Sequence, residues 1–161
     1  MSFALEWNGE TTHDAIRLAV AYLLALPVGL HREQESHSVG VRTFPLVAMA
    51  SCAYILMANP PGHFSLDAQS RVLQGLLAGI GFIGGGAILK SEFSVHGTAT
   101  AASIFAFGVV GAAVASDRYW VALVISLLTL FTLRVLWPLK QRLDRKAETK
   151  ISLTSNEPPV G

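Results

Sequence analysis

The chain has 161 residues, of which 52% are hydrophobic and 14% are charged, and its mean hydropathy is +0.47. It is therefore far more apolar than an average soluble domain of this length. The formal net charge of +1 excludes nucleic-acid binding by bulk electrostatic attraction, and the single cysteine, Cys52, excludes a disulfide within the chain. These properties favour an integral membrane protein, with a soluble helical bundle as the alternative.

Five apolar segments follow one another and predict an all-α, polytopic membrane helix bundle. They cover residues 14–30, 43–58, 71–89, 98–116 and 119–139, between a polar lead-in at 1–13 and a tail at 140–161 that is basic and then disordered. Polar stretches separate the segments, and 31–42 is expected to be a loop. The first segment is short for a hydrocarbon core of about 30 Å. Four spans, with the first segment lying on the membrane surface, is therefore the alternative.

The lysines and arginines predict how the spans are oriented. With the amino terminus outside, the inner segments hold Arg32, Arg42, Lys90 and the basic residues of the tail, whereas the outer loops hold Arg71 and Arg118. Cytoplasmic loops of membrane proteins carry the excess of positive charge. We therefore expect the amino terminus outside and the carboxyl terminus in the cytoplasm.

The segment 71–89 combines an apolar run with several glycines and is expected to form the central helix. Each interior glycine costs a helix roughly 1 kcal/mol relative to alanine, but in a bilayer glycine lets neighbouring helices pack closely. At about 100° per residue, these glycines fall on two faces, which predicts a neighbour in each groove. One neighbour is expected to be the segment 98–116, whose small residues form one stripe. The helix-packing candidates are Gly75, Gly79, Gly81, Gly84, Gly85, Gly86, Gly97, Gly108 and Ala112.

Residues 79–84 also match the G-x-G-x-x-G fingerprint of dinucleotide-binding proteins letter by letter. That fingerprint requires a preceding strand and an acidic residue about 20 positions further on. Glu92 comes too early and Asp117 comes too late, so nucleotide binding is not expected.

Polar residues near the ends of the spans are the candidates for function. Arg32, Glu33 and Arg42 share the predicted inner surface with Lys90, where they are expected to hold helix ends together or to bind an anionic partner or lipid head group. Helix-end anchoring is the alternative for each of them. The full set of polar candidates is Arg17, Arg32, Glu33, Arg42, Thr43, Arg71, Gln74, Lys90 and Thr100.

Two further groupings involve these candidates. Asp14 and Arg17 have the i,i+3 spacing of an ion pair on a helix. Arg71 and Gln74 are expected to lie together at the outer mouth of the glycine-rich helix. Thr100 and Gln74 are side chains that can hydrogen-bond between helices in lipid.

Four motifs, in this order, resemble the MgtC/SapB family of bacterial membrane proteins. The sequence reads GLHRE at 29–33 and GVRT at 40–43, similar to that family's G-L-E-R-E and G-x-R-T. Residues 71–89 are similar to its R-x-x-Q-G-x-x-x-G-I-G-F-(I/L)-G-(A/G)-G-x-I-L, and residues 95–102 to its V-x-G-L-T-T-A-A. Arg17 also matches, so the likeness covers about residues 14–139. The departures include His31 for the first Glu of G-L-E-R-E and Thr98-Ala99 for Leu-Thr.

The resemblance implies a multi-pass protein of the bacterial inner membrane. It implies a link to growth under magnesium limitation and, in pathogenic members, to virulence through survival inside phagocytes. Larger relatives add a soluble carboxyl-terminal domain, so this chain is expected to be a short form without it.

The residues themselves favour a regulator or interaction protein over a transporter or an enzyme. Mg²⁺ prefers oxygen ligands, usually including one or two carboxylates, and no carboxylate lies inside an apolar run. The histidines lack the spacing of a metal site, and the serines have no evident base, so no metal, cofactor or enzymatic activity is expected. The expected partners are the lipid bilayer and another membrane protein or a second copy, bound through small-residue helix faces. Direct transport of Mg²⁺ or another ion is the alternative.

Overall fold

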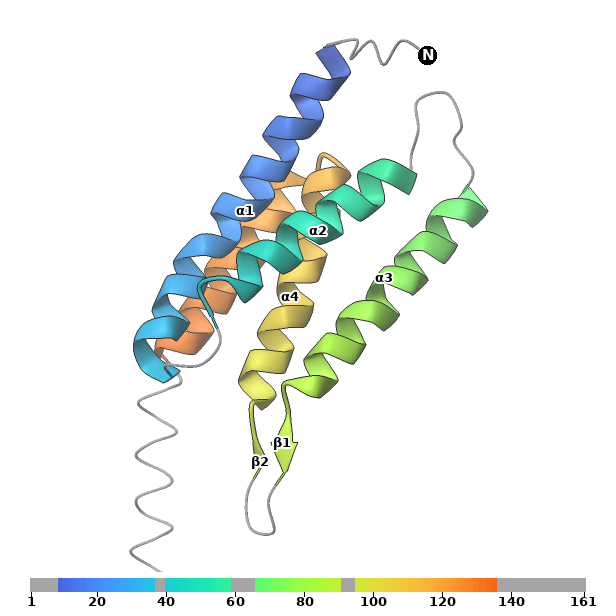
Figure 1. The fold of residues 1–161 in the computed structure, drawn as a ribbon. Helices are drawn as coiled ribbons and strands as arrows, with labels where there is room; N and C mark the ends of the chain where they lie inside the picture. The colour runs from blue at the N-terminus through green and yellow to red at the C-terminus, as the bar shows by residue number, and fades with distance from the viewer. Residues whose placement is uncertain (1–8, 37–39, 59–65, 91–94, 136–161) are drawn as a thin grey trace, which may run out of the picture.

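The computed structural model describes residues 9–36, 40–58, 66–90 and 95–135, and these residues form an all-helical bundle (Figure 1). The elements are α1 (Gly9–Ser36), α2 (Thr43–Ala58), α3 (Leu66–Gly86), β1 (Leu89–Lys90), β2 (Val95–His96), α4 (Thr98–Ala115) and a fifth helix, Tyr119–Val135. β1 and β2 pair antiparallel over two residues each. The prediction of an all-α chain with five helices is confirmed. The tail predicted to be disordered lies outside the described residues.

The helix α1 is longer than the apolar segment from which it was expected. It runs for 28 residues, about 42 Å at 1.5 Å per residue, and continues through the polar residues to Ser36. The prediction of a loop from His31 onward is therefore wrong as far as Ser36. The stretch His31–Ser36 is polar but holds arginine, glutamine and glutamates, which are good helix formers, and loss of hydrophobicity was mistaken for loss of helix.

The centre of the bundle is α4, and not the glycine-rich helix α3. The helix α4 contacts α1, α2 and α3, whereas α3 packs mainly against α4 and α2 and lies at one side of the bundle (Figure 1). The residues of α4 are small or apolar all round the helix, and ten of its 18 residues are buried. The prediction of a central glycine-rich helix is therefore wrong, because α3 carries bulky apolar and polar side chains on its outer faces.

The core forms where α2 crosses α4. The rings of Phe44 and Phe107 stack with their centroids 5.5 Å apart, and both side chains are fully buried. The two backbones approach closely at Gly111, where an added Cβ would overlap the carbonyl oxygen of Ala48 and would lie 2.9 Å from the backbone nitrogen of Cys52. Glycine is therefore required at this crossing.

The contact between α3 and α4 uses two of the predicted packing glycines. An added Cβ at Gly108 would overlap Cδ1 of Ile80, and one at Gly84 would lie 3.4 Å from the carbonyl oxygen of Ala101. Ile80 is the residue through which α3 enters the core, with an exposed fraction of 4%. The 98–116 segment therefore packs against the glycine-rich helix, along the side of α3 that carries Ile80 and Gly84.

The glycines of both predicted faces of α3 have almost no close neighbour among the described residues. No described atom lies within 4 Å of a Cβ built at Gly79, Gly81, Gly85 or Gly86, and Gly75 meets only the hydroxyl of Tyr54, at 3.3 Å. The prediction that a helix of this chain fills both glycine grooves is therefore wrong. A sequence pattern shows where a helix could pack closely, but it does not show whether a helix packs there.

Two helices are long and apolar enough to cross a membrane, Thr11–Glu33 and Thr98–Ala115. Thr43–Ala58 and Tyr119–Val135 are apolar but shorter. Large apolar side chains also point outward from the bundle, including Met57 and Phe82, each 84% exposed, and Trp120, 74% exposed. These counts refer to the residues that the structure describes.

Candidate functional site

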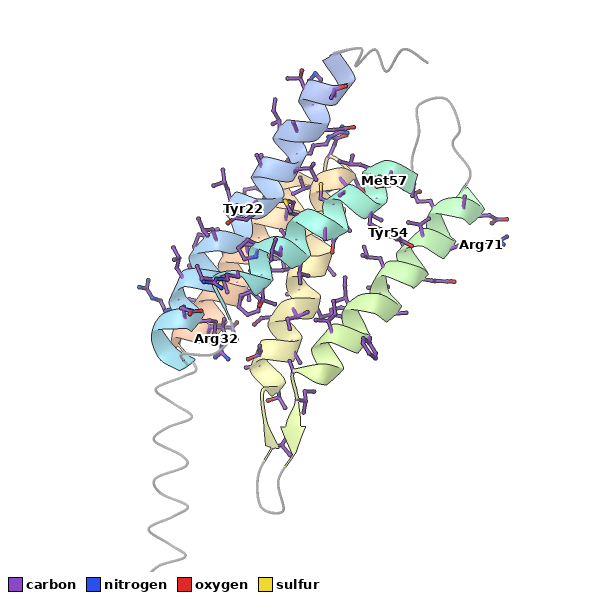
Figure 2. The ribbon with its side chains drawn as sticks, in the orientation of Figure 1. Tyr22, Arg32, Tyr54, Met57 and Arg71 are labelled. Carbon is purple, nitrogen blue, oxygen red and sulfur yellow. The ribbon has the colours of Figure 1, made fainter. Side chains whose placement is uncertain are left out.

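The carboxyl-terminal part of α1 meets the start of α4 at a buried arginine, and we call this group (Gly29, Arg32, Glu33, Gly40 and Thr100) the Arg32 site. Arg32 and Thr100 are each 6% exposed. One terminal nitrogen of Arg32, Nη2, donates to Oγ1 of Thr100 at 2.6 Å. Figure 2 shows Arg32 at the end of α1 that lies near the start of α4. A buried cation is unfavourable without polar partners, so this contact fixes both helix ends.

Two glycines bring the segment after α1 against the helix itself. A Cβ built on Gly40 would lie 2.7 Å from the carbonyl oxygen of Gly29 and 3.0 Å from Cβ of Arg32. The backbone nitrogen of Val41 then donates to Oε2 of Glu33 at 3.4 Å. The motifs at 29–33 and 40–43 therefore form one packed unit, in which the glycines leave room for close backbone contact and Glu33 holds the returning chain.

The other predicted inner residues are arranged differently from the expectation. Arg42 is exposed and Thr43 is half-buried; both begin α2, where the backbone carbonyl of Arg42 accepts from the nitrogen of Leu46 at 3.2 Å. Lys90 lies in β1, and its side chain is outside the described part of the structure. Arg32 thus faces the protein interior, whereas Arg42 faces outward, so the two arginines do not form one surface cluster.

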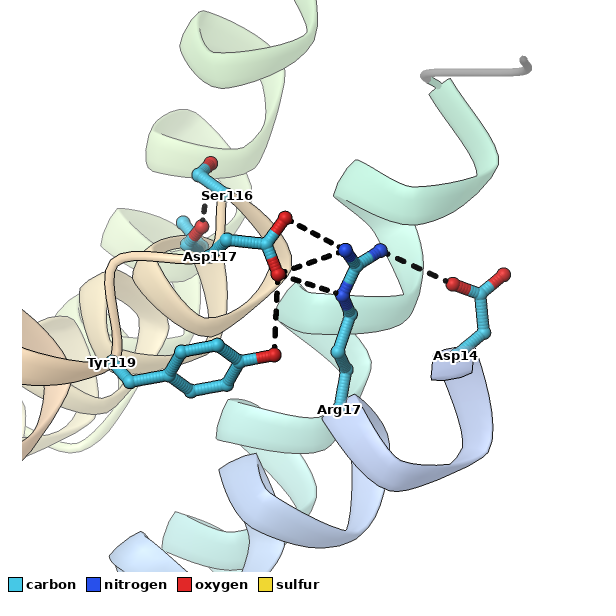
Figure 3. Close-up of polar contacts among 6 residues, drawn as sticks. Asp14, Arg17, Ser116, Asp117 and Tyr119 are labelled. Carbon is cyan, nitrogen blue, oxygen red and sulfur yellow. Dashed lines mark hydrogen bonds and ion pairs between the residues drawn. The ribbon is translucent and has the colours of Figure 1, made fainter. Parts of the chain in front are cut away.

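At the opposite end of the bundle, Arg17 links α1 to the turn that follows α4, and we call Asp14, Arg17, Asp117 and Tyr119 the Arg17 clasp (Figure 3). Arg17 Nη2 contacts the two carboxylate oxygens of Asp117 at 2.8 and 2.7 Å, and Nε contacts Oδ1 at 3.1 Å. The hydroxyl of Tyr119 donates to the same Oδ1 at 3.2 Å. Two donors of one guanidinium therefore share one carboxylate, the geometry in which arginine pairs are strongest.

The predicted pairing of Asp14 with Arg17 is confirmed, with the Oδ1 to Nη1 distance at 3.4 Å. The shorter contacts to Asp117 were not predicted. Asp117 is 100 positions away in sequence, and its only sequence signal was its place in a turn between two apolar segments. It adopts φ +57°, a left-handed conformation that aspartate tolerates better than most residues.

The predicted pair of Arg71 and Gln74 lies on the exposed surface of α3. In Figure 2, Arg71 projects away from α2 and α4. Neither side chain makes a hydrogen bond or ion pair with another described residue. Their proposed role at the mouth of the glycine-rich helix stays a prediction.

Ser126 is a polar contact that sequence reasoning missed. Its Oγ donates to the backbone carbonyl of Leu24 at 2.6 Å and joins the fifth helix to α1. The residue is buried, with an exposed fraction of 6%. A single serine within an apolar run gives no signal that distinguishes such a contact from a solvent- or lipid-facing hydroxyl.

An apolar groove of about 480 Å³ runs between α2 and α3, and we call it the α2–α3 groove. It is lined by Leu46, Val47, Ala50, Ser51, Tyr54, Gly75, Leu76, Gly79, Ile80 and Ile83. In Figure 2, Tyr54 projects from α2 toward α3. The groove contains no charged side chain, so it suits an apolar chain or another helix rather than an ion. Among the described residues, no group of three His, Cys, Asp or Glu side chains could hold a metal ion.

The chain matches a family model and several known proteins. The family model for the MgtC family matches residues 18–142. The chain is 34% identical over 157 residues to protein SrpB of Synechococcus elongatus, covering 86% of each protein. It is 30% identical over 143 residues to the putative magnesium transporter YhiD of Escherichia coli K12, covering 84% of this chain and 66% of YhiD.

A third relative is protein MgtC of Brucella abortus, 31% identical over 135 residues, covering 84% of this chain and 56% of the relative. No solved structure matches the chain. The match at residues 18–142 includes the Arg32 site, the Arg17 clasp except Asp14 and Arg17, and the whole α2–α3 groove. By this match and these identities, the chain belongs to the MgtC family.

Proposed function

We propose that the chain is a multi-pass protein of the bacterial inner membrane that supports magnesium homeostasis by binding another membrane protein or a second copy of itself. The observation that carries this proposal is the set of open glycines on the two predicted faces of α3. The two glycines of α4 closely contact Ile80 and the α2 backbone, whereas no described atom lies within 4 Å of a Cβ built at Gly79, Gly81, Gly85 or Gly86.

The membrane location is supported by the two helices of spanning length and by the large apolar side chains that face outward. In water these side chains would be unfavourably exposed, whereas in a bilayer they contact acyl chains. The lysine and arginine distribution favours an external amino terminus and a cytoplasmic carboxyl terminus. In this orientation the Arg17 clasp lies at the outer surface and the Arg32 site at the inner one.

The regulatory role is supported by the kind of surface that α3 offers. Helices associate in lipid by close contact over small residues, because lipid tails give no hydrophobic driving force between them. The α2–α3 groove, at about 480 Å³, extends this surface beside Gly75 and Gly79. A partner helix has room to approach the α3 backbone here. A role in virulence stays a prediction from the family resemblance.

Direct ion transport is the second candidate, because the relative YhiD is named a putative magnesium transporter. Against it, Asp14 and Asp117 are both held by Arg17, and the groove is apolar. Carbonyl oxygens around Gly84 to Gly86 are the remaining ligands that a transport path could use.

The deciding experiment combines growth with flux. Gly79→Leu places a side chain in the α2–α3 groove, at a position where an added Cβ has no described atom within 4 Å. Ala78→Leu adds the same side chain to an exposed position that does not line the groove. The proposal expects Gly79→Leu to lose growth support at low magnesium at normal protein level, while Ala78→Leu keeps it.

The same proteins, reconstituted in liposomes with an internal Mg²⁺ indicator, test the alternative. The proposal expects no flux above that of empty liposomes for any of them. Saturable flux that requires the wild-type protein would overturn the regulatory role in favour of transport, and equal growth of the two variants would show that the groove has no partner.

A further inference from the structure

The helices α1 and α4 are tied to each other at two separate points. Arg17 binds Asp117, just beyond the end of α4, and Arg32 binds Thr100 in its first turn. The two helices run in opposite directions (Figure 1), so each arginine of α1 reaches one end of α4. At 1.5 Å per residue the two arginines are about 22 Å apart along α1.

Between the two ties, α1 contains Pro27. Proline has no backbone N–H, so the carbonyl of Leu23, four residues earlier, loses its helical donor. The next carbonyl, that of Leu24, accepts from Ser126 Oγ at 2.6 Å. Hydroxyl groups of neighbouring helices commonly satisfy backbone groups near such prolines. Pro27 therefore weakens the α1 hydrogen-bond ladder at Leu23, and the fifth helix holds α1 at the adjacent residue, Leu24.

The two ties differ in exposure. In the Arg17 clasp, the side chains of Arg17 and Asp117 are 24% and 58% exposed, whereas Arg32 and Thr100 are each 6% exposed. An exposed ion pair exchanges with water at little cost and is screened by salt. Separating the buried Arg32 from Thr100 removes a hydrogen bond that water cannot easily replace, because both side chains are shielded from solvent. The Arg17 clasp is therefore the tie that breaks first.

We propose that α1 is a hinged helix, in which the part before Leu23 swings away from the Ser116–Arg118 turn when the Arg17 clasp opens, while the part from Leu24 onward stays fixed by Ser126 and Arg32. The hinge is a conformational device of this chain and does not depend on the partner or ion proposed above. Raising the ionic strength favours the open form, because it weakens the exposed ion pair and leaves the buried contact largely unaffected.

The experiment measures two distances by pulsed electron resonance in purified, lipid-reconstituted protein with a Cys52→Ala background. One spin-label pair sits at Thr12 and Trp120, across the clasp, and the other at Leu30 and Thr98, beside the Arg32 site; all four positions are exposed. Asp117→Asn removes the charge and keeps a residue that tolerates the left-handed conformation. The proposal expects a longer and broader outer distance distribution and an unchanged inner one.

Three variants control the result. Tyr119→Phe removes one hydrogen bond to Asp117 but leaves the ion pair, so it is expected to behave as wild type. The exchange Arg17→Asp with Asp117→Arg is expected to restore the short outer distance. Pro27→Ala, which restores a helical N–H, is expected to reduce the opening caused by Asp117→Asn.

Other outcomes contradict the proposal. An unchanged outer distance in Asp117→Asn would show that the clasp does not hold α1, and a joint change of both distances would indicate general loosening rather than a hinge. If Asp117→Asn lengthens the outer distance equally with and without Pro27→Ala, the bend does not depend on Pro27. If Asp117→Asn does not fold, the outer distance is measured in the wild-type protein, with labels at Thr12 and Trp120, from low to high salt. An outer distance distribution that does not change with salt would then overturn the proposal.

Discussion

The helices α3 and α4 are both rich in glycine, yet they use their glycines in opposite ways. In α4, Gly108 and Gly111 receive Ile80 and the α2 backbone so closely that no side chain fits. In α3, Gly79 and Gly81 face open space. One helix uses glycine to complete the fold of the chain, and the other presents it at the surface.

The difference follows from the remaining residues of each helix. Apart from its glycines, α4 consists of alanines and apolar or small hydroxyl residues, and ten of its residues are buried. The helix α3 carries Arg71, Gln74 and Phe82, all exposed, so only one of its faces can enter a core. The number of glycines therefore does not determine whether a helix is central; the residues between the glycines do.

The largest effect is expected from Gly111→Leu. Even its Cβ would overlap the carbonyl oxygen of Ala48 and would lie 2.8 Å from Cβ of Ser51, and a backbone cannot move aside as a side chain can. Overpacking costs about 1–3 kcal/mol where side chains can adjust, so a clash with backbone is expected to exceed that range and to remove most folded protein. Folded yield and thermal unfolding in detergent measure it. Gly81→Leu is the matched control, and equal yields of the two variants would refute the contrast between the helices.

A smaller effect is expected from Gly108→Ala, because Gly108 lies at the contact between α3 and α4. The added methyl would overlap Cδ1 of Ile80, the end of a flexible side chain, so we expect a loss of about 1–3 kcal/mol. Ile80→Val removes that Cδ1 and makes room for the methyl. In a double-mutant cycle, the pair is expected to be less destabilised than the sum of the single variants, and simple additivity would show that the two residues do not meet.

A third comparison of α3 with α4 concerns the loss of a polar side chain from each helix. Thr100→Val in α4 removes one hydrogen-bond acceptor of the buried Arg32 and is expected to cost about 1–3 kcal/mol. Gln74→Leu in α3 changes an exposed residue and is expected to stay within about 0.5 kcal/mol of wild type. Thermal or denaturant unfolding of the two variants measures both losses of stability. A Gln74→Leu loss as large as that of Thr100→Val would mean that α3 is buried in the protein as purified.

Much of this fold follows from local sequence patterns. The apolar segments predicted five helices, and the bounds of α2 were predicted to the residue, because a polar stretch ending at Arg42 precedes it and consecutive prolines follow it. The Asp14–Arg17 pair was predictable because both residues lie on one helix. These features depend on neighbours in sequence, where helix geometry alone fixes which residues meet.

The long-range contacts were not predictable in the same way. Nothing in the sequence links Arg17 to Asp117 or Arg32 to Thr100, because each pairing depends on how two helices cross. The same limit explains the wrong central helix. Glycine spacing identifies a face that can pack, but the choice among the available faces depends on the summed fit of all the helices.

The smallest expected effect is a change in stability that has opposite signs in the two helices. Gly81→Ala adds a methyl to a position of α3 with no atom within 4 Å, so the change in helix propensity acts alone and is expected to stabilise the protein by about 0.4–1 kcal/mol. Gly111→Ala makes the same change in α4, where the Cβ would overlap the Ala48 carbonyl oxygen, and is expected to destabilise it. Paired thermal unfolding measures both. A loss of stability in Gly81→Ala that increases with protein concentration would show that the open face of α3 is occupied by a second copy, because only an assembled face would resist a single methyl group.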